Sequence, residues 1–136
     1  MTDRRPLYEG RLLPQMHGLW YLASPYSNYP LGREIAFAEV CEAAAWLMDD
    51  GVQVFCPIAH THPIARYTTS PDTHEFWLCQ DQAILQHARG VVIYQLPEWA
   101  HSYGVTWETG YMRALGGPVL YMRRDTAERF ILSTTP

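Results

Sequence analysis

The sequence predicts a single α/β domain built around a small parallel sheet. Its length of 136 residues suits one domain with a hydrophobic core. Short apolar runs alternate with segments of helical composition, and each run is continuously apolar, as in strands covered on both faces. Hydrophobic residues make up 48% of the chain and charged residues 18%, which is typical of a globular protein rather than a disordered one.

Four strands and three helices follow from these local patterns. Residues 1–17 show no periodicity and are expected to form an N-terminal arm, so that the domain spans residues 18–136. The expected strands are the apolar runs Leu19–Ala23, 52–57, 91–96 and 118–122. The expected helices are 33–50, which is rich in alanine and ends at Gly51, 75–90 and 103–117.

The connections between these elements are expected to form the functional edge. Ligands of open α/β sheets bind beyond the carboxyl ends of the strands, where residues 24–32, 57–74 and 96–104 should meet. The second connection is long for a structureless loop and is expected to be functional or mobile. The tail over residues 123–132 is expected to form a last helix. Together these features predict a three-layer fold of the Rossmann or flavodoxin type.

Charge and cysteine content exclude several classes of function. The net charge is −4, so a nucleic-acid partner is not expected. All ten basic residues are Arg, and without Lys the chain cannot form a Schiff base. Cys41, Cys56 and Cys79 are widely spaced, as expected of reduced thiols in a cytoplasmic protein. The N-terminus has no long apolar run, so neither a signal peptide nor a membrane partner is expected.

Two acids lie in apolar stripes on expected neighbouring helices. Asp81 has apolar residues three and four positions away on both sides, and Glu108 is flanked in the same way by Val105 and Met112. An acid in such a stripe costs free energy unless it is paired or has a chemical role. For either acid alone, a capped or salt-bridged structural role is the ordinary explanation. Two of them near the ligand edge favour a pair of carboxylates acting at an anomeric carbon.

Other residues near the same edge suit ligand binding. Ser102 is a plausible cap for the last helix, and Gly104 allows close approach to its free amides, so this terminus suits an anion. His60 and His62 have spacing that suits zinc, with His74 or Glu75 as further ligands, but the rest of such a ligand set is unsuitable. We expect instead no metal, with one histidine contacting base or phosphate. Aromatic residues that suit base stacking, or alternatively core packing, are Tyr26, Tyr67, Trp77 and Tyr111.

These residues resemble the nucleoside 2-deoxyribosyltransferase superfamily, which includes the deoxynucleoside monophosphate N-glycosidases. The resemblance rests on "YLASPYS" after the first strand, an Asp in the second helix, and "S-x-G-x-x-x-E-x-G-Y…A-L-G-x-P-V". It covers about residues 19 to 122. The tract "FCPIAHTHPIA…EFWLCQDQAIL" is closer to an uncharacterised phage or bacterial branch, and its His-rich loop is unlike that of the well-studied transferases.

The resemblance implies a catalytic group made of Glu108, Asp81 and Tyr21. Glu108 is then the nucleophile that attacks the anomeric carbon, expels the base and forms a glycosyl-enzyme intermediate. Asp81 helps to position groups or to transfer a proton, and Tyr21 contacts the nucleophilic carboxylate. No cofactor is implied, and members of the superfamily resemble one another in forming homodimers or larger homo-oligomers.

The resemblance also implies the substrate class. Six residues before the nucleophile, transferases acting on free nucleosides carry Asp, whereas the monophosphate hydrolases carry Ser. Ser102 therefore implies a 2′-deoxynucleoside 5′-monophosphate, with Arg33 as a candidate phosphate clamp. Two alternatives stay open: a transferase acting on free deoxynucleosides, and a non-catalytic nucleotide-binding module. The expected substrate-binding residues are Ser24, Pro25, Tyr26, Ser27, His60, Trp77, Ser102 and Gly104.

Overall fold

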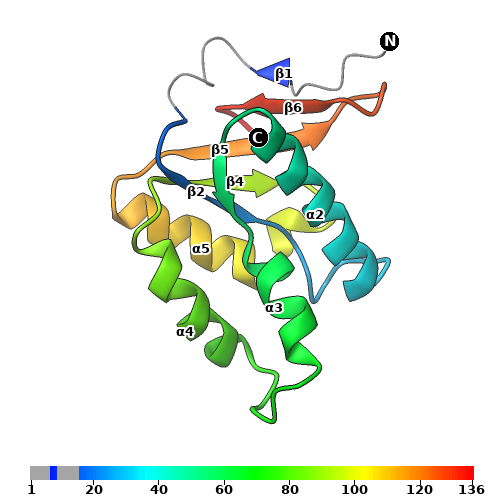
Figure 1. Cartoon of the computed structure of the whole chain (residues 1–136), viewed down its shortest axis with the longest axis vertical. Coiled ribbons are helices and arrows are strands. Elements are labelled where there is room, and N and C mark those ends of the chain that lie inside the picture. Colours follow the sequence, from blue (N-terminus) through cyan, green and yellow to red (C-terminus); the bar gives the residue numbers. More distant parts are fainter. Residues whose placement is uncertain (1–6, 9–15) are drawn as a thin grey trace.

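The protein is a three-layer α/β domain, in a computed structural model that describes residues 16–136 and the backbone of Leu7–Tyr8. A six-stranded sheet forms the middle layer. Helix α2 (Arg33–Asp49) covers one face, and helices α4 (His74–Leu85) and α5 (Tyr103–Ala114) pack together on the other side (Figure 1). This arrangement confirms the predicted α/β class with a flavodoxin-like layer order.

The sheet has the strand order β1-β6-β5-β4-β2-β3, and all of its pairs are parallel except β5 with β6. The chain runs from β2 outwards to β3 and then returns to β4 on the other side of β2. This reversal makes a topological switch point at the carboxyl ends of β2 and β4. The strands are β1 (Leu7–Tyr8), β2 (Leu19–Ala23), β3 (Gln53–Phe55), β4 (Gly90–Tyr94), β5 (Val119–Arg124) and β6 (Phe130–Ser133).

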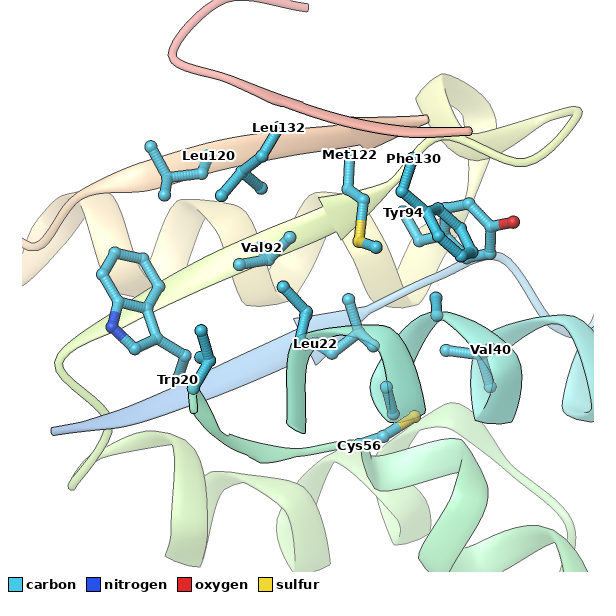
Figure 2. Packing of buried hydrophobic residues seen from close by; sticks show 14 of the residues in the cluster. Trp20, Leu22, Val40, Cys56, Val92, Tyr94, Leu120, Met122, Phe130 and Leu132 are labelled. Atoms are coloured by element: carbon cyan, nitrogen blue, oxygen red, sulfur yellow. The ribbon is translucent and has the colours of Figure 1, made fainter. Parts of the chain in front are cut away.

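The central strands are buried on both faces, because successive side chains point to opposite sides of the sheet. Along β2, Trp20 and Leu22 join the core cluster under α2, whereas Tyr21 and Ala23 join the cluster under α4 and α5. Figure 2 shows the first cluster, in which Val40 of α2 faces side chains from four strands of the sheet. This double burial explains the continuous apolar runs, and it sends Tyr21 towards α5.

The expected loop over residues 57–74 is wrong in its first half, because α3 (Pro57–Ala65) occupies it. Pro57 takes the first helical position, where a proline loses no hydrogen bond and its fixed φ suits the helix. The hydroxyl of Thr61 donates to the Pro57 carbonyl at 2.9 Å. Pro63 lies inside the helix, where a proline removes a backbone hydrogen bond, and the helix ends two residues after it. Figure 1 shows α3 and α4 at the end of the molecule opposite β1 and β6.

The expected C-terminal helix is also wrong. β5 continues to Arg124, a turn follows, and β6 returns antiparallel to β5. The turn is held by Asp125, whose carboxylate accepts the amides of Ala127 and Arg129 at 2.8 and 2.9 Å. Burial alternates along β6, because Phe130 and Leu132 are buried whereas Ile131 is only half-buried. This alternation of period two is typical of a strand.

The expected N-terminal arm lies only partly within the described residues. Of the expected arm, residues 1–6 and 9–15 lie outside the described residues, whereas Leu7–Tyr8 pair with β6 as an edge strand. Within residues 16–136, no helix is long and apolar enough to cross a membrane.

Gly90 is required by close packing at the start of β4. A Cβ at this position would lie 2.6 Å from the Trp20 ring and 2.8 Å from the Pro118 carbonyl oxygen. We expect Gly90→Ala to lower the free energy of unfolding by about 1–3 kcal/mol, as overpacking does. Gly110→Ala is the matched control, because a Cβ there meets nothing within 4 Å and alanine favours the helix by about 0.5–1 kcal/mol. Urea titration of both variants checks this, and equal stability of the two would contradict it.

Candidate active site

A cavity of about 670 Å³ lies where the loops after β2, β3 and β4 meet, at the predicted edge of the sheet. Its volume is in the usual range for small-molecule sites. Four segments form the wall: the β2–α2 connection, α3, the start of α4, and the start of α5. The lining residues are Ser24, Tyr26, Ser27, Asn28, Arg33, Pro57, Ile58, Thr61, His62, Ala65, Asp72, Thr73, His74, Trp77, Leu78, His101, Ser102, Tyr103, Gly104 and Glu108.

Glu108 is the buried acid of this wall. It lies in the second turn of α5, and only 5% of its surface is exposed. Burial raises the pKa of its carboxyl from 4.5 to about 8, because the charged form loses its hydration. The Tyr21 hydroxyl opposes this rise by stabilising the carboxylate, and the charge of Asp81 adds to it. Near neutral pH the carboxyl therefore exists in both charge states, with the protonated form in excess, and a shift of this kind is typical of active-site groups.

Tyr21 and Asp81 stand behind Glu108 and are not part of the cavity wall. Burial raises the pKa of Asp81 from 3.8 to about 7, and the Tyr21 hydroxyl again opposes the rise. The pKa of Tyr21 lies well above 10, first through burial and then through the charges of Glu108 and Asp81. Its hydroxyl interacts with both carboxyls, although among the described residues it makes no hydrogen bond of good geometry. The structure thus brings together the three residues that the sequence singled out as catalytic.

The start of α5 forms a neutral, donor-rich part of the wall next to Glu108. The Ser102 oxygen accepts the amide of Val105 at 3.3 Å and caps the helix, which leaves the hydroxyl proton free to donate. A side chain at Gly104 would come within 3.7 Å of the nearer Glu108 oxygen, so glycine keeps the space above the carboxyl open. Free amides at a helix start favour an anion.

Aromatic and charged side chains from three segments form another part of the wall. The Trp77 indole donates to Asp72 at 2.7 Å, and Arg33 donates to the other Asp72 oxygen at 2.8 Å. Arg33 holds the pKa of the Asp72 carboxyl below its usual range, with a smaller effect from Trp77. The guanidinium carbon of Arg33 also lies 5.1 Å from the centre of the Tyr26 ring. Arg33 is therefore already paired with Asp72 and does not stand free as a clamp.

Not every expected binding residue reaches the cavity. Pro25 is buried beside it but does not line it. His60 also lies outside the wall, with its ring 5.7 Å from that of Phe55, whereas His62 faces the cavity. The expected residues that do line it are Ser24, Tyr26, Ser27, Trp77, Ser102 and Gly104.

The residues that the sequence reasoning missed come mostly from α3 and the segment after it. Thr61, His62 and His74 lie in the stretch that the sequence predicts to be a loop, where no spacing rule says which side chains share a face. The helix start signal at Pro57 indicates a helix, in which residues 58, 61, 62 and 65 fall on one face. Within the described residues, no group of three or more His, Cys, Asp or Glu side chains is placed to hold a metal ion.

Comparison with known proteins gives a family and a fold neighbour. A family model described as "Domain of unknown function (DUF1937)" matches residues 18–124. No curated protein matches the chain. Among solved structures, the 2-deoxyribosyltransferase of the psychrotolerant bacterium Bacillus psychrosaccharolyticus is similar, with 26% sequence identity and a TM-score of 0.53. The match covers 77% of this chain and 72% of that one, and it supports the resemblance at the level of the superfamily.

The raised pKa of Glu108 predicts a pH dependence of stability. Between the unfolded pKa of about 4.5 and the folded pKa of about 8, the folded state binds more protons at this residue, so the stability of the fold falls as the pH rises. Glu108→Gln removes this term, and its advantage over the parent should grow by on the order of a few kcal/mol between pH 5 and pH 8. Urea unfolding at both pH values measures it.

Glu75→Gln is the matched control for this measurement, because Glu75 is an exposed acid in the first turn of α4. It should follow the parent at both pH values. A constant difference between Glu108→Gln and the parent across this pH range would show that Glu108 is charged in the folded state throughout.

Proposed function

We propose that this chain, which belongs to the DUF1937 family, cleaves the N-glycosidic bond of a 2′-deoxynucleoside 5′-monophosphate. The observation that carries the proposal is a buried carboxyl, Glu108, on the wall of a nucleotide-sized cavity, with Tyr21 and Asp81 behind it. The similarity to a 2-deoxyribosyltransferase supports an enzyme that transfers deoxyribosyl groups. The proposed reaction uses only side chains of the protein and no cofactor.

In the first step, the Glu108 carboxylate attacks C1′ of the sugar. A new ester bond forms between the carboxylate and C1′, the bond from C1′ to the base breaks, and its electron pair leaves with the base. The Tyr21 hydroxyl steadies the carboxylate for attack. Because burial removes most of its hydration, the carboxylate is more reactive than one in water.

In the second step, water or a second base attacks the same carbon and releases Glu108. Water gives hydrolysis, and a second base gives transfer, the reaction named for the similar solved structure. We propose that Asp81 positions groups or takes up a proton during this exchange, since its pKa of about 7 allows both charge states near neutral pH.

The walls suggest how the substrate lies. Tyr26 and Trp77 offer aromatic surface to the base, and Ser24 and Ser27 offer hydroxyls to the sugar. The Ser24 hydroxyl is buried and has no hydrogen-bond partner among the described residues, so a ligand would satisfy it. The 5′-phosphate is proposed to lie at the start of α5, against Ser102 and the open space above Gly104.

We further propose a homodimer or larger homo-oligomer acting in the cytoplasm. A stripe of apolar side chains spaced four residues apart runs along α5 from the cavity mouth, and a second copy would cover it. Three unpaired cysteines suit a reducing compartment. The stripe consists of Tyr103, Trp107, Tyr111 and Leu115.

Glu108→Gln should abolish base release while leaving the fold intact. The amide keeps the shape of the side chain but cannot act as the nucleophile, so we expect a loss of ~10³-fold or more in rate. Chromatography of released base from a panel of deoxynucleosides and their monophosphates measures this. Glu75→Gln should retain the parent rate, because this exposed acid lies outside the cavity. Normal turnover by the Glu108 variant would end the proposal.

Ser102→Asp should reverse the preference between a monophosphate and its nucleoside. Aspartate still caps the helix, but its charge repels phosphate and its oxygens accept a free 5′-hydroxyl. Each charge-assisted bond to phosphate is worth roughly 1.5–3 kcal/mol, or about tenfold to hundredfold in preference. The measured quantity is the ratio of kcat/KM for the two substrates.

Ser102→Thr is the matched control, because threonine keeps both the cap and the hydroxyl donor and should keep the preference for monophosphate. If the parent prefers the free nucleoside, or if the aspartate leaves the ratio unchanged, Ser102 serves only as a helix cap.

A further inference from the structure

The imidazole of His62 links a cavity residue to the protein surface. Its Nδ1 is hydrogen-bonded to the hydroxyl of Tyr26, and its Nε2 lies 2.9 Å from a carboxylate oxygen of Glu34. The ring also stacks on Phe37, with centroids 4.4 Å apart and planes at 23°. Both ring nitrogens and one ring face are therefore held, which fixes the imidazole in one orientation.

The three hydrogen-bonded residues form a path from the cavity to solvent. Tyr26 and His62 both line the cavity that contains Glu108, whereas the side chain of Glu34 is 76% exposed. The other two histidines of the described wall are engaged differently. His74 stacks on Tyr103, and His101 pairs with Glu98.

Cleavage of a glycosidic bond needs a proton at the departing base as well as a nucleophile at C1′. Glu108 must be a carboxylate to attack, so it cannot also supply this proton. Asp81 stands behind Glu108 and does not line the cavity in which the base would lie. Tyr26 offers aromatic surface on that wall and carries a hydroxyl connected to His62.

On the basis of the proposed function, we propose that Tyr26, His62 and Glu34 form a proton relay that protonates the departing base. As the bond from C1′ to nitrogen breaks, its electron pair stays on the base, and the phenolic proton of Tyr26 moves to a base nitrogen. The Nδ1 proton of the His62 imidazolium replaces it on the tyrosine oxygen. The imidazole is left neutral. Its remaining proton stays on Nε2, which donates to the Glu34 carboxylate, while the Glu108 carboxylate becomes the neutral ester.

Charge is balanced in this step, because the negative charge of Glu108 and the positive charge of His62 disappear together. The attacking water of the second step returns one proton through Tyr26 to His62. Tyr26 is the catalytic residue of the relay, and His62 and Glu34 act through it as positioning residues.

The surroundings of Tyr26 suit a proton donor. Burial raises the pKa of Tyr26 above 10, so the phenol stays protonated until the proton is transferred to the departing base. Arg33 lies over the ring at 5.1 Å and stabilises negative charge that develops on the tyrosine oxygen. Asp72 holds Arg33 in this position at 2.8 Å.

The test compares leaving groups that need a proton with one that does not. The substrates are the four common deoxynucleoside monophosphates and 4-nitrophenyl 2-deoxyribose 5-phosphate, whose nitrophenolate leaves unprotonated. Tyr26→Phe and His62→Gln should slow release of natural bases by ~10²–10⁴-fold and should leave nitrophenolate release within the same order of magnitude. Glu34→Gln should show the same selectivity with a smaller effect, and it changes only an exposed side chain.

The control variant is His87→Gln, which alters an exposed histidine outside the cavity and should match the parent on every substrate. Thermal unfolding of each variant checks the fold, and Glu34→Gln carries the test if a cavity variant does not fold. Base release by the parent should also slow in D₂O, and this isotope effect should vanish in Tyr26→Phe.

The outcomes separate the two proposals. Equal slowing of natural bases and nitrophenolate, unchanged release of natural bases, or a parent without a solvent isotope effect would overturn the relay while the glycosidase proposal stands. A parent that releases neither base nor nitrophenolate from any of the five substrates would overturn both. Loss of both activities in Glu108→Gln, with selective loss in His62→Gln, supports both.

Discussion

The burial of one carboxyl, Glu108, beside Tyr21 and Asp81 is the constraint on which the site depends. An ionised carboxylate without water is costly, and here the cost appears as pKa values raised to about 8 for Glu108 and about 7 for Asp81. A single phenol, Tyr21, is close enough to both acids to offset part of that cost. Such a group lowers the stability of the folded protein at neutral pH, which is why we propose a chemical role for it.

The side-chain periodicities of β2 and α5 bring Tyr21 and Glu108 together. Tyr21 points away from α2 because it alternates with Trp20 and Leu22 along a strand buried on both faces. Glu108 lies one turn into α5, close enough to the capped start of that helix to share a wall with Ser102. Both elements meet at the switch point between β2 and β4, where the loops diverge and leave room for a ligand.

Much of this arrangement was predictable from sequence, and the failures have physical reasons. The central strands, α2, α4 and α5 follow from periodicity, and Asp81 and Glu108 follow from acids in apolar stripes. Tyr21 was expected only from the resemblance to the nucleoside 2-deoxyribosyltransferase superfamily. Helix α3 was missed, because its nine residues contain an interior proline, Pro63, and so give a weak helical pattern. That error hid the cavity-facing role of His62, since side-chain direction in a presumed loop cannot be assigned.

A covalent bond between Glu108 and the anomeric carbon defines the proposed reaction. It is tested most directly by intact-mass analysis of the protein after incubation with a 2′-fluorinated 2′-deoxynucleoside 5′-monophosphate, whose fluorine slows breakdown of the intermediate. We expect a mass increase equal to one fluorinated deoxyribosyl phosphate, located on Glu108 by peptide sequencing and absent from Glu108→Gln. Release of base with no adduct, or with an adduct on another residue, would contradict it.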